Sequence, residues 1–308
     1  AMVYMAKKAI IVGDDQQVSP MAIGVDIEQS NNLLDMYLKN VIPNYNLYDM
    51  KGSIYDIANT TFHPLMLREH FRCVPEIIGF SNALSYDCKI KPMRDGSDNK
   101  LLPAVVNYHV ENGKRVSKYN VEEAITIVAL LKSCMMQEEY ADKTFGVISL
   151  LGSEQIKKLQ SFLFKYIEPR DLEKHRVLCG DAANFQGDER DVIFLTLVDS
   201  PNENGGPIRI TTEGTDDSMK KRYNVAASRA RNQMWVVHSL DSANDLKPGD
   251  MRKRLIDYAQ NPTTLTNQIN EAEKKSESPF EEMVAKSLIS LGYNITMQYP
   301  VGAYRLDM

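Results

Sequence analysis

Short apolar runs and longer segments with helical spacing alternate along most of the chain. Runs rich in Val, Ile and Leu, each bounded by polar or turn-forming residues, are typical of strands buried in a sheet. They predict strands at 8–13, 104–109, 145–150, 176–180, 191–198 and 233–239. Because helix-like stretches separate the last five runs, the pattern favours an α/β fold with a parallel, doubly wound sheet.

Two segments between these runs have the spacing of amphipathic helices. In 152–167 the apolar residues recur every three or four positions and form one stripe, as expected for a helix packed on a sheet. The segment 120–136 is predicted to form a second helix. It opens with Asn120 and Glu123, whose spacing is that of a capping box.

The polar segment 243–277 interrupts this alternation. It contains a basic helical stretch and is mostly charged towards its end, so it is predicted to be a helical arm and linker. The pattern therefore divides the chain into a first domain at 2–242, the linker at 243–277 and a further segment at 278–308.

A new amphipathic helix is predicted to begin at Ser278, where Pro279 suits the first helical position and Gly292 suits the stop. Strands are predicted at 294–299 and near 304–308. This arrangement is typical of the start of a domain. Because the first apolar run also comes abruptly after the N-terminus, we expect the chain to be a piece of a longer protein.

Composition excludes several classes of protein. The chain has 308 residues, of which 43% are apolar and 25% are charged, and these values exclude collagen-like, mucin-like and wholly disordered proteins. No apolar run approaches the roughly 20 residues of a membrane span, and no signal-peptide pattern is present. The four cysteines are scattered, which indicates reduced thiols and a cytoplasmic protein. Since the net charge is −5, a nucleic-acid site would have to be a local basic patch.

The loop Gly13–Pro20 follows the first predicted strand. Loops at the carboxyl ends of parallel strands are where such sheets bind ligands. The glycine permits a turn, and backbone amides in such a loop can contact phosphate. An ordinary polar turn is the alternative.

Two further segments supply arginines. Arg72 lies within 67–77, and an arginine at the tip of a loop can bind phosphate through two hydrogen bonds. Arg222 and Arg229 lie seven residues apart in 222–231, on the same face of a predicted helix. The alternatives are a surface ion pair for Arg72 and a solvent-exposed basic helix face for the other two.

The loop Asn184–Asp191 comes directly before the strongest predicted strand. Its Glu189 is an acceptor that suits ribose hydroxyls, and Gly187 allows close approach of the backbone to a ligand. A loop rich in turn-forming residues, without a ligand, is the alternative.

The order and residue types of these motifs together resemble the second RecA-like domain of superfamily 1 helicases. The resemblance covers residues 8 to about 240 and is to the branch typified by the nonsense-mediated-decay and replication-associated helicases. The matching segments are Gly13–Pro20 (G-D-x-x-Q-L-x-P), Leu67–Ile77 (Q-Y-R-M-x-P-E-I, with His70 and Phe71 for Gln and Tyr), Gly146–Gln155 (G-I-I-T-P-Y-x-x-Q), Phe185–Asp191 (F-Q-G-x-E-x-D) and Asn224–Arg231 (N-V-A-x-T-R-A-R, with Ser228 for Thr). It implies a P-loop NTPase fold, with a parallel sheet flanked by helices.

The resemblance also implies roles for individual residues. Arg72 and Arg229 would act as arginine fingers on the γ-phosphate of ATP, and Gln17 would sense that phosphate and couple it to the nucleic acid. Glu189 would hold the ribose. Further nucleotide contacts would come from Gln186, Gly187, Gly13 and Asp14, and nucleic-acid contacts from Ser149, Gln155 and Asn224.

The chain departs from the family pattern in two places. The residues 181–183 replace a T-V-D/H run and 149–151 replace T-P-Y, and both departures concern the single-strand contacts. In addition, no G-x-x-x-x-G-K-[S/T] sequence occurs in the chain. The resemblance therefore implies that the P-loop and the Mg²⁺ ligands belong to a first RecA-like domain that precedes this one in cis.

Residues 278–308 resemble the opening of a restriction-endonuclease-like domain, similar to the very-short-patch-repair nucleases. In that family Asp307 would be the first metal carboxylate and Glu281 a supporting one, in a metal site that is incomplete here. A capping box at the start of the helix is the alternative for Glu281.

We therefore expect the C-terminal motor domain of an ATP-dependent helicase that acts on a single-stranded nucleic acid, in particular DNA. ATP and Mg²⁺ would serve the complete protein, and the isolated chain would be inactive. Two alternatives remain open. One is a nucleic-acid-binding module without catalysis, and the other is a loader for the fused nuclease.

Overall fold

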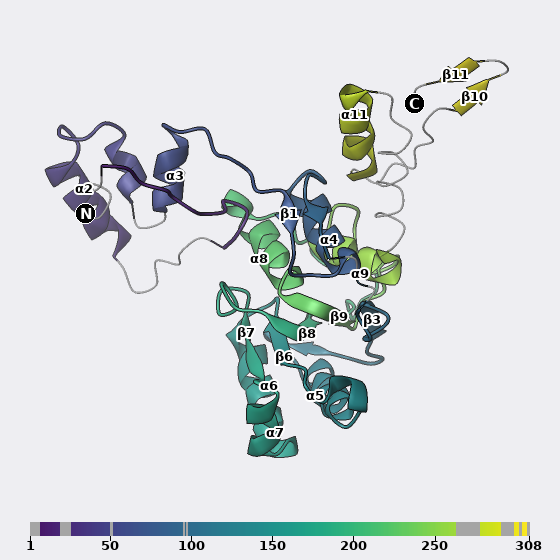
Figure 1. Ribbon diagram of the computed structural model, residues 1–308. Coiled ribbons are helices and arrows are strands. Elements are labelled where there is room, and N and C mark those ends of the chain that lie inside the picture. The colour runs from purple at the N-terminus through teal and green to yellow at the C-terminus, as the bar shows by residue number, and fades with distance from the viewer. Residues whose placement is uncertain are drawn as a thin grey trace. The chain divides into compact units, whose positions relative to one another are not determined.

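The computed structural model describes residues 7–18, 26–49, 52–94, 96, 98–262, 278–290, 299–301 and 304–306 (Figure 1). The chain divides into two compact units, Ala1–Leu67 and Arg68–Met308, and each is described by itself. No helix among the described residues is long and apolar enough to cross a membrane.

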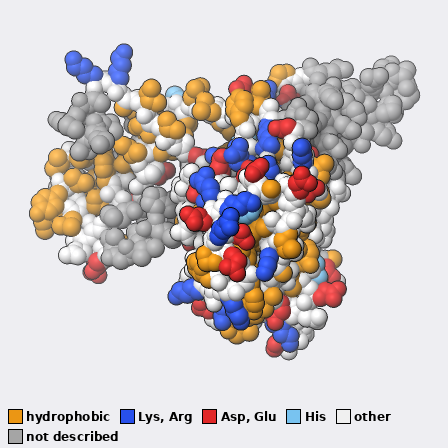
Figure 2. All heavy atoms as spheres, turned by 60° about the horizontal axis from the view of Figure 1, so that its bottom comes forward, with side chains coloured by type: hydrophobic (Ala, Val, Ile, Leu, Met, Phe, Trp, Pro, Cys, Tyr) orange, Lys and Arg blue, Asp and Glu red, His pale blue; other side chains and the backbone are white. Residues whose placement is uncertain are grey.

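The first unit contains short helices with well-formed caps. The helix α2 spans Ile27–Tyr37, the 3-10 helix η1 spans Tyr45–Tyr48, and α3 spans Ile54–Asn59. Asp26 caps α2, and Ser53 with Asp56 forms a capping box on α3. None of these three elements has a buried residue, and Figure 2 shows many hydrophobic side chains at the surface of this unit.

The predicted strand at 8–13 is wrong. Residues 7–18 form bends and a turn, and the side chains of Ile10 and Val12 are 94% and 87% exposed. An apolar run becomes a strand only where a neighbouring strand completes its hydrogen-bond ladder. None of the described residues pairs with this run.

The second unit is built on a five-stranded parallel sheet, and this confirms the predicted α/β, RecA-like fold class. The strand order is β3-β9-β8-β6-β7, and all four pairings are parallel. These strands are β3 (Val105–His109), β6 (Phe145–Ser149), β7 (Leu178–Asp181), β8 (Arg190–Thr196) and β9 (Ala230–His238). The last five predicted strands are therefore confirmed. They could be predicted because strands buried on both faces appear in the sequence as nearly continuous apolar runs.

Helices flank this sheet on both faces (Figure 1). The α-helices between Arg68 and Gln260 are α4 (Pro75–Ser85), α5 (Val121–Met135), α6 (Ser153–Tyr166), α7 (Pro169–Lys174), α8 (Ser218–Ala227) and α9 (Met251–Gln260). The core between α5, α6 and the sheet includes Ile127, Leu159, Phe145 and Phe194. On the other side, α4 packs on α8, where the Ser81 hydroxyl donates to the backbone carbonyl of residue 224 at 3.1 Å.

Several short elements complete the described chain. They are the parallel pair β1 (Glu69–His70) and β2 (Lys91–Pro92), the antiparallel hairpin β4 (Arg115–Val116) and β5 (Tyr119–Asn120), the 3-10 helices η2 (Glu138–Tyr140) and η3 (Thr215–Asp217), the helix α11 (Pro279–Ser290), and the antiparallel pair β10 (Tyr299–Val301) and β11 (Tyr304–Leu306). The predicted helix after Ser278 is confirmed. Gly292 and most of the strand predicted at 294–299 lie outside the described residues.

The helix α9, predicted to be part of a linker, packs on β3 and β9. Its first turn is fixed by a buried ion-pair network in which Arg252 contacts Asp250 at 2.7 Å and Asp199 at 2.5 Å. Arg115 contacts the same Asp199 at 2.5 Å. The helix therefore belongs to the packed unit around the sheet, whereas the division of the chain at 242/243 and 277/278 stays a prediction.

Glu123 is a fully buried carboxylate at the start of α5. It accepts hydrogen bonds from the Thr196 hydroxyl at 2.5 Å, the Val198 amide at 2.9 Å and the Ser239 hydroxyl at 2.9 Å. Asn120 caps the helix as predicted, with its side chain accepting from the Glu123 amide. The reciprocal half of the capping box is not formed, because the backbone amide of Asn120 donates to Oε1 of Gln155 and not to the Glu123 carboxylate.

Burial raises the pKa of Glu123 to about 7 from its ordinary value of 4.5, although the hydrogen bonds from Thr196, Val198 and Ser239 oppose this rise. The folded chain therefore binds this proton more tightly than the unfolded chain does. Its stabilising contribution is fully present below about pH 4.5 and is lost as the pH rises through about 7.

We predict that Glu123→Gln removes this pH dependence. Between pH 5 and 8 the wild-type free energy of unfolding should fall more steeply with pH than that of the variant, as measured by urea denaturation. The neighbouring, exposed Glu122→Gln is the matched control and should keep the wild-type slope. Equal slopes for wild type and Glu123→Gln would show that this carboxyl does not titrate in that range.

Candidate functional site

The pairing of β8 with β9 brings two sequence-distant residues together at the amino edge of the sheet. Arg190 is opposite Ala230 in the ladder, so Glu189 and Arg229, the residues just before each strand, are neighbours. The Arg190 amide donates to the Arg229 carbonyl at 3.1 Å, which extends the pairing to these residues. The sheet register thus positions both side chains.

The loop that carries Arg72 is tied to the same edge. It joins β1 to α4, and the Val74 amide donates to the Arg231 carbonyl at 3.1 Å. The Cys73 amide donates to Nε2 of His70 at 3.0 Å, and the Cys73 thiol donates to the Ser228 carbonyl at 3.4 Å. These contacts close the loop against the start of β9.

The His70 ring acts as an acceptor in this loop. Its burial, together with the positive charge of Arg72, lowers the pKa of His70 to about 4, although Glu189 opposes this effect. The imidazole is therefore neutral at physiological pH and can accept the Cys73 amide. Burial also raises the pKa of the Cys73 thiol to about 12, so this cysteine is protonated and unreactive.

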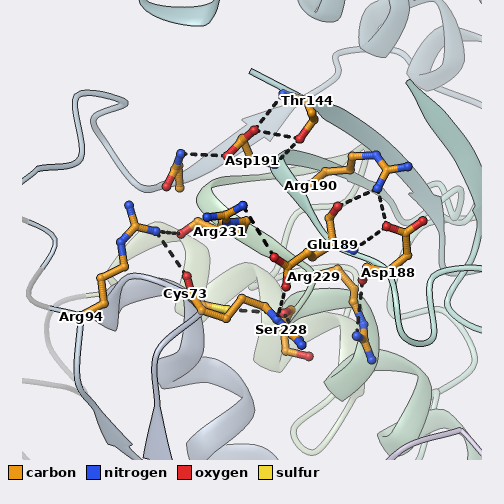
Figure 3. A network of polar contacts seen from close by, with 12 residues as sticks. Cys73, Arg94, Thr144, Asp188, Glu189, Arg190, Asp191, Ser228, Arg229 and Arg231 are labelled. Carbon is orange, nitrogen blue, oxygen red and sulfur yellow. Dashed lines mark hydrogen bonds and ion pairs between the residues drawn. The ribbon is translucent and has the colours of Figure 1, made fainter. Parts of the chain in front are cut away.

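Glu189 is the carboxylate at the centre of the cluster. Its Oε2 lies 2.5 Å from Nε of Arg72, and its Oε1 lies 3.6 Å from Nη1 of Arg231. Figure 3 shows Glu189 beside Arg229 and Arg231, with Asp188 turned towards Arg190, with which it forms an ion pair. One carboxylate therefore contacts two guanidinium groups at this edge.

Arg229 is held more deeply than the other arginines. Its side chain is 2% exposed, and Nη1 donates to the Asp188 carbonyl at 3.4 Å. Burial, and next the positive charge of Arg72, lower the pKa of Arg229. Guanidinium groups this close to one another repel, and Glu189 offsets only part of their charge. Arg72, Arg229 and Arg231 against a single Glu189 give the cluster a net positive charge that suits an anionic ligand.

Arg94 ties the backbones of this cluster together. Its Nη1 donates to the carbonyls of Arg72 at 3.2 Å and of Arg231 at 3.0 Å (Figure 3). No sequence pattern indicated this residue, because contacts to backbone carbonyls leave no trace in the residue types around them. Arg231 was visible as the last arginine of the 222–231 motif, but its contact with Glu189 was not predicted.

The loop before Glu189 is shaped by a glycine. Gly187 has φ +83°, a backbone conformation that residues other than glycine rarely adopt, and no atom lies within 4 Å of where a Cβ would be. The glycine is thus required by the turn rather than by packing. Gln186 and Gly187 are both exposed, as a ligand contact would require, and they come shortly before Glu189 in the sequence.

The residues predicted to contact nucleic acid lie elsewhere and are buried. Ser149, the last residue of β6, is 1% exposed, and its hydroxyl donates to the Leu151 carbonyl at 3.0 Å. Gln155 is fully buried and bonds to Asn120 and Thr196. Asn224 is buried within α8. Their contact with a strand stays a prediction, and in this conformation their side chains are engaged inside the protein.

Gly13, Asp14 and Gln17 lie in the first unit. The Gln17 side chain donates to Oδ2 of Asp14 at 2.9 Å, and the Gln16 amide donates to Oδ1 at 2.9 Å. The structure therefore groups these residues with one another. Their predicted role beside the arginines stays a prediction.

The metal site predicted in the C-terminal segment is not tested. Asp307 lies outside the described residues. Ser278 caps α11, since its hydroxyl accepts from the Glu281 amide at 3.2 Å and donates to the Glu281 carboxylate at 3.0 Å. Within the described part of the chain, no group of three or more His, Cys, Asp or Glu side chains is placed to hold a metal ion.

Comparison with known proteins gives matches over most of the chain. The profile of the AAA domain family matches residues 51–241. The mouse 5'-3' DNA helicase ZGRF1 is 27% identical over 77% of this chain and 12% of its own length. Helicase sen1 of Schizosaccharomyces pombe is 24% identical over 83% of the chain and 14% of its own length. The MG140 homologue of Mycoplasma pneumoniae, described as an uncharacterized ATP-dependent helicase, is 23% identical over 83% of the chain and 23% of its own length.

The chain thus spans less than a quarter of the length of each of these three relatives. Among solved structures, the C-terminal domain of a possible DNA helicase from Lactobacillus plantarum WCFS1 matches with 14% identity and a TM-score of 0.33. The match covers 59% of this chain and 92% of that one.

We predict that Arg94→Ala loosens the Arg72 loop without unfolding the chain. The amides of Cys73 and Val74 should exchange with solvent about tenfold faster or more, because the variant loses both carbonyl contacts that hold the loop to β9. Hydrogen exchange followed by mass spectrometry measures this change. Lys89→Ala is the control, because it removes an exposed lysine that lies between α4 and Arg94 in the chain. Unchanged exchange in 70–74 would mean that Arg94 does not hold the loop.

Proposed function

Because this chain belongs to the AAA domain family, we propose that it is the second RecA-like motor domain of an ATP-dependent superfamily 1 helicase. The parallel α/β sheet and the similarity to helicases over most of the chain support this proposal. In the larger protein it would act with a first RecA-like domain that carries the P-loop.

The observation that carries the proposal is the convergence of three motifs. Arg72, Glu189 and Arg229 are far apart in sequence, and the structure gathers them at the amino edge of β8 and β9. A single surface ion pair would explain one arginine and one carboxylate. It would not explain a second arginine that is 2% exposed and repelled by the first.

The chemistry of this cluster fits a nucleoside triphosphate. Guanidinium groups bind phosphate oxygens in a fixed, forked geometry, and a carboxylate accepts from ribose hydroxyls. We assign Arg72 and Arg229 to the γ-phosphate and Glu189 to the ribose. The exposed Gln186 and the turn at Gly187 would approach the same nucleotide. When bound, ATP would supply the phosphoanhydride whose cleavage drives movement along the strand.

The ion pair between Arg72 and Glu189 has a consequence for this mechanism. A ribose hydroxyl bound to Oε2 of Glu189 would compete for that oxygen with Arg72, whose Nε is now 2.5 Å away. Arg72 would then be released to turn towards the γ-phosphate, while Arg231 keeps Glu189 in place. The carboxylate would thereby link ribose binding to positioning of the first arginine.

The Mg²⁺ ligands and the phosphate-binding lysine would come from the first RecA-like domain, since the sequence holds no P-loop motif. Gly13, Asp14 and Gln17 would lie between the two domains and report the γ-phosphate to the nucleic acid. We propose a single strand, in particular DNA, as the substrate. The DNA helicase named among the relatives supports this choice.

The C-terminal segment from Ser278 is proposed to begin an endonuclease-like domain. Glu281 and Asp307 would then contribute to a metal site completed by residues beyond the chain. The confirmed helix α11 is compatible with this proposal, but its capping contact at Glu281 already accounts for that residue.

In the larger protein, we predict that Arg72→Ala and Arg229→Ala each lower ATP turnover by about 10³-fold or more, the scale of an arginine finger. ATP affinity should fall much less, because these charges act mainly on the transition state. Steady-state kinetics with a fluorescent nucleotide titration separate the two effects. Arg170→Ala, on the exposed surface of α7, is the control and should have wild-type turnover. Wild-type turnover in either finger variant would remove that residue from the site.

For the isolated chain, we predict no ATP hydrolysis at any nucleotide concentration, because it lacks the P-loop lysine and the Mg²⁺ ligands. A coupled phosphate-release assay measures this directly. Turnover that is abolished by Arg229→Ala would contradict the proposal that a second domain completes the site.

A further inference from the structure

A second cluster of cations lies at the carboxyl edge of the sheet, around the bend 150–152 that follows β6. The Ser149 hydroxyl fixes this bend through the carbonyls of Leu151 at 3.0 Å and Gly152 at 3.4 Å. The buried Ser149, Gln155 and Asn224 leave open which side chains could reach a strand at this edge. Three basic residues around the bend, which are exposed or partly exposed, supply an answer.

Lys118 lies at the tip of the hairpin β4–β5. Val116 pairs with Tyr119, so the turn contains only Ser117 and Lys118, and Ser117 has φ 55°. Arg115 braces this turn through a hydrogen bond from Nε to the Ser117 carbonyl at 2.6 Å. The stem of Lys118 lies against the bend, since a Cβ on Gly152 would be 3.3 Å from its Cβ and Cδ. The hairpin thus presents an ammonium group beside residues 150–152.

Two other elements add positive charge at the same place. Lys158 of α6 places its Nζ 5.1 Å from the centre of the Tyr119 ring, next to Lys118 in the hairpin. Arg222 of α8 donates from Nη1 to the Leu150 carbonyl at 3.2 Å. Cations from a hairpin and two helices therefore border one bend.

The charge of the two lysines is not neutralised locally. Among the described residues neither Lys118 nor Lys158 has an ion-pair partner, although Glu154 is one turn before Lys158 on the same helix. Arg115, in the same hairpin, does have a carboxylate partner in Asp199. On the face shown in Figure 2, basic and acidic side chains are interspersed over the second unit, as expected for a net charge of −5. An unpaired basic cluster is therefore a local feature of this chain.

We propose that Lys118, Lys158 and Arg222 form a surface that binds the phosphodiester backbone of a single-stranded nucleic acid. This inference rests on the proposed helicase function and assigns the strand contacts to residues outside the predicted ones. Lysines that contact phosphates bind all sequences similarly and make affinity fall as salt rises.

The test is strand binding by the full 308-residue chain and its Lys118→Ala/Lys158→Ala variant, measured by the anisotropy of fluorescein-labelled oligothymidylate and oligouridylate across a salt series. The affinity of the variant for both strands should be at least about tenfold lower than that of the wild-type chain. Its plot of log affinity against log salt should be shallower by about 0.7 per lysine removed. A Lys118→Arg/Lys158→Arg variant should keep wild-type affinity and slope.

Lys165→Ala is the matched control. Lys165 lies on the same helix, with its Nζ 5.0 Å from the centre of the Tyr166 ring, but about 10 Å further along the axis. The variant should bind as wild type does. Thermal unfolding confirms that each variant is folded.

Three results would overturn the inference. If the wild-type chain binds strands and the double alanine variant binds equally well, the surface is not the strand site, while the helicase proposal stands. If the double variant loses affinity for fluorescent ATP but not for strands, the lysines serve the nucleotide instead. If the wild-type chain binds neither strand at any salt concentration, both this inference and the nucleic-acid part of the proposed function are wrong.

Discussion

The ladder between β8 and β9 is the constraint on which the rest of the unit depends. At its amino end it sets Glu189 beside Arg229, through a register in which Arg190 faces Ala230. At its carboxyl end the same two strands lead into the donors that hold the buried Glu123. A shift of this register by one residue would exchange the two faces of a strand and separate both clusters at once.

The two ends of these strands differ in their electrostatics. At the amino edge, arginines crowd around one carboxylate, and Glu189 offsets part of their mutual repulsion. At the carboxyl edge, lysines stand on the surface without carboxylate partners. The seven residues of β8 separate the two edges by about 23 Å. A nucleotide site and a strand site on opposite edges of one rigid sheet would therefore move together when the domain moves.

The sequence predicted the sheet well and the sites unevenly. Parallel strands buried on both faces are apolar throughout, so five of them could be predicted, whereas the run at 8–13 has the same composition but no described partner strand. The resemblance selected Arg72, Glu189 and Arg229, but their mutual contacts depend on the register and could not be predicted. The burial of Gln155, whose side chain accepts a hydrogen bond from the Asn120 backbone amide, could not be predicted either, since a buried glutamine and an exposed one look alike in sequence.

We propose above all that Arg72 and Arg229 face the γ-phosphate from one edge of this sheet. The most direct measurement is a structure of the larger protein with ADP, Mg²⁺ and tetrafluoroaluminate, an analogue of the transferred phosphoryl group. We predict that both guanidinium groups lie about 2.7–3.2 Å from the fluorides, with Glu189 turned from Arg72 to the ribose. Both arginines remaining on Glu189 and Asp188, with the nucleotide bound elsewhere, would contradict it.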